Sequence, residues 1–524
     1  MNPTPLLPRN PQRRLALQAL AAGAALPWWA QAAAPQRVLR VAAGPDRYNT
    51  DPERFNFTLR GPHAQIAETG VRPNAQFEPE PLLFERWQVR AGQYRVTLRA
   101  GLRHHDGSAF DSAAAIAALQ FMAQRRTDFL QIDPASLRAL DARSFSFRSR
   151  TDSNLVIENM SHRAASFFSP HSDRSSAPAG TGPWRFARYQ PGQVLELVRN
   201  DAYWGPRAPH ARMEFRFVPD GQSRLMALVA GEVDLVSEVN PQMLLGLSPA
   251  LPVQLHRSRP VSYLALLVNL HGQPPFARLA DPRLRRALAL SIDREAVARV
   301  LYGGHGVVAR GLLPDWMFGL GAHVQGWGHD PVQARALLEA AGWTLGPDGL
   351  RQRNGELLRL RLVAAFPNLA AVAPFPELLQ QMLRAVGIAL EIVAVDDSAL
   401  YSQRFLEPGA GDLFVELAGN TNLDPTFLLY NLFHSQTPWR GYRHMAAGAA
   451  LDRALDAARA SADAAQRLDA VRRAHRIVID EALAAIPILL VPQFVLSRPG
   501  VRLTMSEHRD WIDYGAALLP NGAR

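Results

Sequence analysis

Segments with a helical hydrophobic pattern alternate with strand-like segments along most of the chain, and this alternation constrains the fold more than any other feature. Two helices are marked clearly, because an Asp-Pro pair opens both "DPRLRRALALSI" (from Asp281) and "DPVQARALLEAAGW" (from Asp330). Aspartate is a favoured N-cap, and proline is best tolerated at the first helical position. Helices that alternate with strands must cover sheets, so we expect an α/β fold.

The length of the chain excludes a single core. It has 524 residues, whereas single hydrophobic cores stop growing at about 250–300 residues. "WQVRAGQYRVTLRAGL" predicts a hairpin around Ala91-Gly92, with Tyr94, Val96 and Leu98 on one face. "FDSAAAIAALQFMAQRR" predicts a helix capped by Asp111 or Ser112. We therefore expect more than one lobe, each built of covered sheets.

The first 32 residues have the pattern of an export signal. Arg9, Arg13 and Arg14 precede an apolar, alanine- and leucine-rich stretch that closes on Ala30-Gln31-Ala32, a small-x-small cleavage site. The paired arginines favour the twin-arginine route, and the general secretory route stays open. The chain has no cysteine, so it forms no disulfide and carries no lipid-modified N-terminal cysteine. We expect a periplasmic protein exported by a cleavable signal peptide.

The charge of the chain argues against nucleic-acid binding. The formal net charge is +10, and every basic residue is an arginine. These arginines are scattered, with no run of five or six like charges, which excludes a polybasic tail or membrane patch. We expect most of them to lie on a solvated surface.

Three short motifs could carry chemistry, and each is better explained as structure. In "LRHHDGSAF", His104 and His105 would point to opposite faces and could not both reach one zinc, whereas Asp106-Gly107 is a turn dipeptide. "GTGPW" resembles a phosphate loop, but a strand pattern follows it where a helix would be needed. Asp396-Asp397 ends a strand-like run. These carboxylates are therefore better explained by exposure to solvent at the strand end, or by capping of a helix, than by acid–base catalysis.

Seven segments in order resemble the periplasmic solute-binding proteins of ABC importers, in the oligopeptide/dipeptide/nickel family (family 5). They are "YRVTLRAGLRHHDGSAFDSAAAI", "GTGPWRFARYQPG", "LVRNDAYWG", "ALVAGEVDLV", "DPRLRRALALSIDREAV", "HDPVQARALLEAAGW" and "NLDPTFLLYNLFHS". The resemblance covers about residues 38–500 and implies that "HHDG" is a structural turn. It also implies two lobes with a two-stranded hinge and an extra subdomain in lobe one.

The domain boundaries implied by this resemblance divide the chain after the signal peptide (1–32). Lobe one would comprise 37–62, 180–262 and 487–524, its inserted subdomain 63–179, and lobe two 263–486. The hinge would lie near Ser262–Leu266 and Ile486–Leu490. Ligand would bind between the lobes, and closure would bury it.

Within the family, the nickel-binding branch is the most similar. Its members hold a nickel chelate partly through two arginines that grip the carboxylates of the chelator. One lies in an Arg-x-x-aromatic pattern, which Arg126 and Phe129 match, and Arg163 in "SHRAASFFSP" matches the other. Arginine suits this work because its planar fork pairs with both carboxylate oxygens. For each arginine, the alternative is an ordinary surface residue.

The loop "AGNTNLDPTF" departs from both ligand classes of the family. Gly419 and Leu423 stand where the nickel branch has aromatic residues, and Thr421 stands where peptide-binding members have an aspartate for the ligand's α-amino group. His434 falls a residue or two from the position of the branch's metal ligand, so it is a candidate rather than an assigned ligand. Asp424-Pro425 is expected to shape the loop.

The resemblance therefore implies a binding protein and not an enzyme. We expect it to capture a small carboxylate-bearing solute, either a metal chelate such as a nickel complex or a short or modified peptide, and to deliver it as a monomer to an inner-membrane permease. Nickel would be cargo and not a cofactor. Two alternatives stay open: a di- or oligopeptide-specific binding protein without metal, and a periplasmic metal-dependent hydrolase using His104, His105, Asp106 and His434.

Overall fold

The computed structural model describes residues 37–46, 48, 63–125, 130–150, 154–174, 176–271, 274, 277–320, 323–365, 372–395, 411–419, 423–437, 440–505 and 512–520. The predicted signal peptide, Arg126, Phe129, Asp396-Asp397 and Thr421 lie outside these residues. Within them, one mixed sheet runs through the molecule in the order β18-β17-β19-β12-β20-β11-β1-β10-β9-β8, with β13 paired to β20. The α/β fold expected from the sequence is therefore confirmed.

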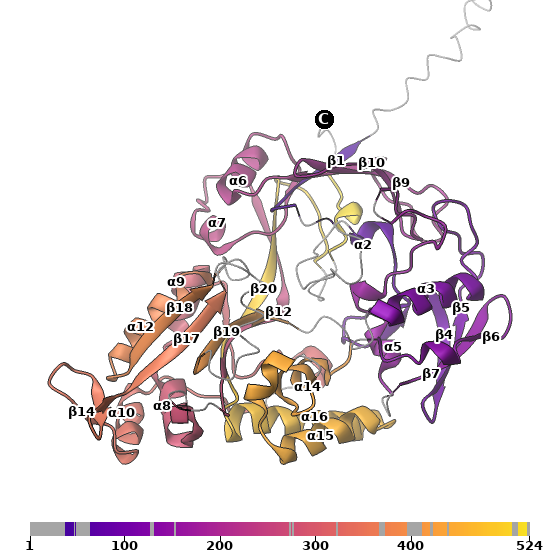
Figure 1. The fold of residues 1–524 in the computed structure, drawn as a ribbon. Helices are drawn as coiled ribbons and strands as arrows, with labels where there is room; N and C mark the ends of the chain where they lie inside the picture. The colour runs from indigo at the N-terminus through magenta and orange to yellow at the C-terminus, as the bar shows by residue number, and fades with distance from the viewer. Residues whose placement is uncertain are drawn as a thin grey trace, which may run out of the picture.

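One end of this sheet, which we call the first lobe, lies at the top of Figure 1. Its core faces bury Leu39, Val41 and Phe215 on one side and Ala42 with Leu225 on the other. The elements of the first lobe are β1 (Val38–Ala43), β8 (Trp184–Gln190), β9 (Val194–Arg199), β10 (Arg212–Phe217), β11 (Leu235–Val236), α2 (His63–Ile66), α6 (Gly221–Val229), α7 (Pro241–Leu245) and the 3₁₀ turn η10 (Tyr514–Ala516).

The other end of the sheet, the second lobe, carries most of the helices (Figure 1, lower left and bottom). Its strands are β13 (Val307–Val308), β17 (Arg359–Ala365), β18 (Ala389–Val395) and β19 (Leu413–Ala418), with a small sheet of β14 (Thr344–Leu345), β15 (Arg351–Arg353) and β16 (Glu356–Leu357). Its helices are α8 (Pro282–Ser291), α9 (Arg294–Tyr302), α10 (Pro331–Ala340), α12 (Phe375–Arg384), α14 (Phe427–Phe433), α15 (Ala449–Ala460) and α16 (Ala464–Arg476), which continues as a π-turn, η9 (Ile477–Glu481). Three 3₁₀ turns, η5 (Ala277–Ala280), η6 (Met317–Gly319) and η8 (Arg440–Met445), complete it.

A subdomain with its own core lies beside the first lobe (Figure 1, right). The predicted hairpin is present, and Tyr94, Val96 and Leu98 are all buried on one face. The elements of the subdomain are β2 (Val71–Pro73), β3 (Pro79–Pro81), β4 (Phe84–Arg90), β5 (Gln93–Leu98), α3 (Ser112–Arg125), η3 (Pro134–Ser136), β6 (Arg138–Ala139), β7 (Ser144–Arg148), α5 (Val156–Asn159) and η4 (Arg163–Ala165). Ile66 and Ala67 pack into the core of the first lobe, whereas the core of the subdomain begins at Val71.

Two long antiparallel strands, β12 (Gln254–Val268) and β20 (Ala485–Ser497), join the halves of the sheet. The pairing is irregular between Arg257 and Ser262, where Pro260 faces Pro492. Proline has no N–H, so neither residue donates to the ladder at this point. The N–H of Gln493 donates instead to the hydroxyl of Ser258, at 2.9 Å.

The helix caps read from the sequence are present. The Asp281 carboxylate accepts the N–H of Arg283 at 2.9 Å, and that of Asp330 accepts the N–H groups of Val332 and Gln333 at 3.1 and 2.9 Å. Asp111, and not Ser112, caps α3, because its carboxylate accepts the N–H of Ala114 at 3.0 Å. No helix within the described ranges is both long enough and apolar enough to cross a membrane.

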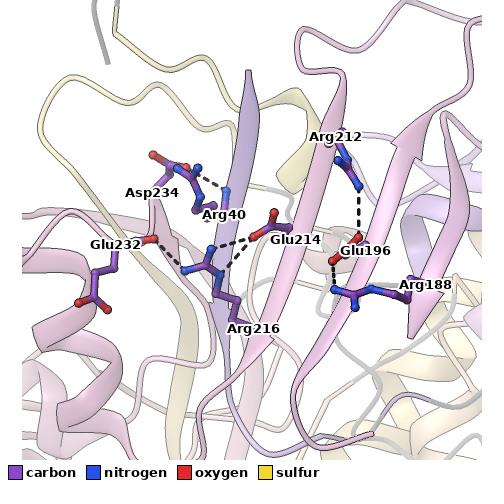
Figure 2. Close-up of polar contacts among 8 residues, drawn as sticks. All are labelled: Arg40, Arg188, Glu196, Arg212, Glu214, Arg216, Glu232 and Asp234. Atoms are coloured by element: carbon purple, nitrogen blue, oxygen red, sulfur yellow. Dashed lines mark hydrogen bonds and ion pairs between the residues drawn. The ribbon is translucent and has the colours of Figure 1, made fainter. Parts of the chain in front are cut away.

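The outward face of the first-lobe sheet shows how some of the arginine charge is accommodated (Figure 2). Glu196 on β9 pairs with Arg188 on β8 and with Arg212 on β10, the latter at 3.3 Å. Arg216 pairs with Glu214 at 2.9 Å and donates to the carbonyl of Glu232 at 3.3 Å. Cross-strand pairs of opposite charge stabilise a sheet only modestly, so these arginines form a solvated surface, as expected.

The strand expected after "GTGPW" is confirmed, and the segment itself packs closely against another part of the backbone. A side chain at Gly180 would place its Cβ 2.2 Å from the carbonyl oxygen of Ile66, and β8 begins directly at Trp184. The glycine lets two backbones approach closely, which is its usual role at such contacts.

We expect Gly180→Ala to destabilise the protein by about 1–3 kcal/mol, the usual cost of overpacking against a fixed neighbour. The measurement is the thermal midpoint by calorimetry. Gly328→Ala is the matched control, because a Cβ there meets nothing within 4 Å and its backbone needs no left-handed conformation. Equal midpoints for the two variants would contradict the packing role of Gly180.

Candidate functional site

The paired histidines form a turn, as expected, and both are occupied by hydrogen bonds. His105 accepts the N–H of Gly180 through Nδ1 at 3.2 Å, which leaves Nε2 to donate to the carbonyl of Gly182 at 2.9 Å. Burial lowers the pKa of His105 to about 4, so the ring is neutral at neutral pH. His104 is buried and bonds Ser108 at 3.0 Å, while Gly107 has φ of 87°. This pair ties the subdomain to the first lobe and offers no paired nitrogens for a metal.

Arg163 is the predicted ligand contact that the structure places most distinctively. It begins the 3₁₀ turn η4 (Arg163–Ala165), and only 4% of the residue is exposed to solvent. His162 fixes the turn, because its Nδ1 accepts the N–H of Ala164 at 3.0 Å. A buried guanidinium needs opposite charge or hydrogen-bond acceptors around it. Arg163 is therefore not the surface residue that was its alternative explanation.

Two carboxyl groups, the buried one of Glu68 and that of Asp513, lie within electrostatic range of Arg163. Glu68 follows α2, and Asp513 precedes η10, so both belong to the first lobe. Burial raises the pKa of each carboxyl, and the positive charge of Arg163 acts against this rise in both. The Glu68 carboxylate accepts the hydroxyl of Tyr203 at 2.7 Å and the indole N–H of Trp204 at 3.1 Å. Arginine stays protonated in proteins, so the cluster contains one fixed positive charge beside a buried carboxyl whose ionisation is disfavoured by burial.

A few residues away, the subdomain touches the second lobe through what we call the interlobe contact: Asn154, Glu158 and Ser161 on one side, and Leu423, Arg459 and Ala460 on the other. The N–H of Asn154 donates to the carbonyl of Arg459 at 3.1 Å, and its side-chain amide donates to that of Ala460 at 2.8 Å. These carbonyls end α15, where helix carbonyls lack partners within the helix. The N–H of Leu423 points to the hydroxyl of Ser161 at 3.1 Å and to the carbonyl of Glu158 at 3.4 Å.

A second contact between the lobes is aromatic. Phe77, in the turn between β2 and β3, is 1% exposed and packs into a core of the second lobe. Its ring lies edge-on to the rings of Trp316 and Phe318, with distances of 5.7 and 4.9 Å between ring centres. Both contacts hold the subdomain against the second lobe.

Leu423 and Asp424 show how the predicted ligand loop is shaped. Leu423 is buried, and its backbone, rather than its side chain, makes the polar contact described above. The Asp424 carboxylate accepts the N–H and the hydroxyl of Thr426, at 2.7 and 2.6 Å. The expectation that Asp424 shapes the loop is confirmed.

His434 lies just beyond the end of α14 against α15. Its ring stacks on Tyr430 at 4.2 Å, and its Nδ1 accepts the N–H of Gln436 at 2.9 Å. The proton of the neutral ring is therefore on Nε2, which faces Asp456 and Asp452 at 3.3 and 3.7 Å. Among the described residues, no group of three or more His, Cys, Asp or Glu side chains could hold a metal ion. His434 as a ligand of the cargo metal stays a prediction.

No sequence pattern pointed to several of these groups. Asn154, Glu158 and Ser161 match no motif, and Phe77 stands at a left-handed position (φ 65°) that usually selects glycine or asparagine. Their partners lie hundreds of residues away along the chain, so only the folded arrangement could reveal them. Arg163 is the one predicted polar contact that falls among the described residues near these contacts.

Comparison with known proteins agrees with this geometry. Residues 78–439 match the family model of bacterial extracellular solute-binding proteins, family 5 (middle region). The chain is 25% identical to the nickel-binding periplasmic protein of Escherichia coli K12 over 499 residues, which cover 87% of this chain and 91% of that protein. It is 27% identical to the glutathione-binding protein GsiB of Pectobacterium atrosepticum over 326 residues, 58% of each chain.

A solved structure shows the same fold. NikA from Brucella suis, in complex with Fe(III)-EDTA, superposes with a TM-score of 0.80 at 22% identity and covers 91% of this chain and 99% of its own. The two-lobed architecture is thus shared, and the family match extends over well more than half of the sequence. The chain belongs to the bacterial extracellular solute-binding proteins of family 5, the substrate-binding components of ABC importers.

Proposed function

We propose that this protein captures a small carboxylate-bearing solute between its lobes in the periplasm and delivers it, as a monomer, to an ABC permease of the inner membrane. The observation that carries the proposal is the buried Arg163, which lies beside the interlobe contact and within electrostatic range of the buried Glu68, whose ionisation is disfavoured by burial. A guanidinium in this setting can accept an incoming carboxylate as a paired, charge-assisted partner. Arg126, with Phe129, is the second proposed contact, and Thr421 and Leu423 are further proposed ligand contacts.

The ligands of the relatives support this chemistry. One relative is a nickel-binding protein, another binds glutathione, and the similar solved structure holds Fe(III)-EDTA. Glutathione and EDTA both carry carboxylate groups, although one is a peptide and the other a chelator. A carboxylate is therefore the feature that unites the candidate solutes, and a metal would enter as part of the cargo, with His434 as its proposed ligand.

The mechanism follows from the two long strands. The hinge was predicted near Ser262–Leu266 and Ile486–Leu490, and these segments do pair with each other. We propose that bending occurs next to them, at the Pro260–Pro492 pair, where the backbone ladder lacks both donors. A solute that contacts both lobes has a higher affinity for the closed state and so shifts the population toward it.

The periplasmic location is proposed from the sequence of residues 1–32 together with the extracellular family. Relatives of this family act as solute-binding proteins and not as enzymes. The two histidines of "HHDG" are engaged in a turn, so no observation favours the hydrolase alternative.

Arg163→Ala should weaken solute binding by about 10- to 100-fold, since a charged hydrogen bond contributes roughly 1.5–3 kcal/mol. The measurement is titration calorimetry with Fe(III)-EDTA, Ni(II)-EDTA, glutathione and the dipeptide Met-Leu as probes. Arg185→Ala, an exposed arginine on β8, is the matched control and should bind each probe normally. Unchanged affinity in Arg163→Ala, for a probe that the native protein binds, would remove Arg163 from the site.

Native mass spectrometry of protein purified from a periplasm, without refolding, should show one small adduct per chain whose mass fits a carboxylate-bearing compound. A nickel isotope pattern would identify a chelate and support His434 as a ligand. A series of adducts that differ by amino-acid residue masses would identify peptides instead. An adduct without any acidic group would contradict the proposed solute class.

A further inference from the structure

The interlobe contact places two carboxyl groups from opposite lobes close together. Glu158 lies on α5 of the subdomain, and its backbone carbonyl receives the N–H of Leu423, the residue directly before Asp424. Asp424 is 3% exposed, and its carboxylate is fixed by Thr426. The negative charge of Asp424 raises the pKa of the Glu158 carboxyl, so the two groups are coupled electrostatically across the contact.

The neighbours of this pair come from several elements. Arg467 on α16 acts on both carboxyl groups, and Arg459 on α15 acts on Asp424. Arg459 also lies over the ring of Tyr430, 4.1 Å from its centre, and Arg467 donates to the carbonyl of Ser461 at 3.2 Å. Tyr94 on β5 is uncharged at neutral pH, because burial raises the pKa of its hydroxyl above the ordinary value of 10. The two arginines favour ionised carboxylates, but burial is the larger influence on both acids.

We propose that closure of the two lobes is coupled to proton uptake by the Glu158–Asp424 pair. When the lobes part, the hydrogen bonds of Asn154 and Leu423 break and Glu158 returns to water. When they close, like charges approach each other and lose water, which disfavours the doubly ionised pair. This inference rests on the proposed function in one respect: the closure that takes up a proton is the same closure that retains the solute.

The direction of the pH dependence follows from linkage. In the closed state burial raises the pKa of Glu158 from its ordinary value of 4.5 to about 7, and it raises that of Asp424 as well. Below pH 4.5 the acid is neutral in both states, so closure carries no ionisation cost. Between pH 4.5 and about 7 closure takes up a proton and becomes less favourable as the pH rises. Above about pH 7 the cost is complete and closure no longer changes with the pH through this group.

The absence of cysteine allows a direct test. Cysteines introduced at the exposed Ala187 on β8 and Ala340 on α10 can carry a donor and an acceptor dye, one on each lobe. Energy transfer is measured from pH 4.5 to 8 on the full chain without added solute, after native mass spectrometry shows a bare mass. We expect the closed-to-open ratio to fall about tenfold or more between pH 4.5 and 7 and then to level off.

Glu158→Gln should flatten this curve and keep the lobes closed at pH 8, because a neutral amide cannot ionise. Asp424→Asn should act in the same direction, and its amide oxygen can still accept from Thr426. Glu85→Gln is the matched control, since Glu85 lies on the same subdomain in an exposed pair with Arg143 and should leave the curve unchanged. If circular dichroism shows that one variant is misfolded, the other decides.

A wild-type curve that is flat between pH 4.5 and 7, or variants of Glu158 and Asp424 that both follow the wild type, would overturn the proposal. Because no solute is present, this failure is distinct from that of the proposed solute class. A protein that binds no carboxylate could still show the pH-dependent closure, and one with a flat curve could still bind its solute through Arg163.

Discussion

The antiparallel pairing of β12 with β20 is the interaction on which the rest of the molecule depends. These strands belong at the same time to the half-sheets of both lobes: β19 pairs with one end of β12, and β11 pairs with the far end of β20. All other elements of each lobe are placed relative to this pair. A continuous ladder would make the sheet rigid, but Pro260 opposite Pro492 removes two backbone donors at one level. The ladder is interrupted at this level, which is why the bend is proposed there.

A few contacts between the subdomain and the second lobe do not involve the central strands. The aromatic ring of Phe77 is buried in the second lobe. The backbone and side-chain N–H groups of Asn154 donate to carbonyls at the end of α15, which have no partner within the helix. Each such bond has a modest net value, since water can replace it when the lobes part. In the proposed mechanism, contacts of this size are weak enough for a bound solute or a proton to shift the balance between open and closed states.

How much of this could be foreseen depends on the range of the interaction. The helix starts at Pro282 and Pro331 were read correctly because the N-cap carboxylate and the N–H that donates to it lie two or three residues apart. The hairpin at Ala91-Gly92 was equally local. The candidate site was foreseen only in part: Arg163 was found by resemblance, but its burial beside Glu68 and Asp513 was not, because Asp513 lies 350 residues further along the chain. Glu158 would not have been singled out from the sequence at all.

The sequence by itself determined the α/β class, the capped helices, the turn at His104-His105 and, through an ordered set of segments, the family. All of these depend on neighbours within a few residues or on the order of segments, which the chain carries explicitly. Only the tertiary structure decided that Pro260 faces Pro492, that Phe77 enters the second lobe and that Glu158 meets the Asp424 loop. These relations arise because the chain passes more than once between the lobes. The groups that meet therefore come from distant segments that share no local sequence pattern.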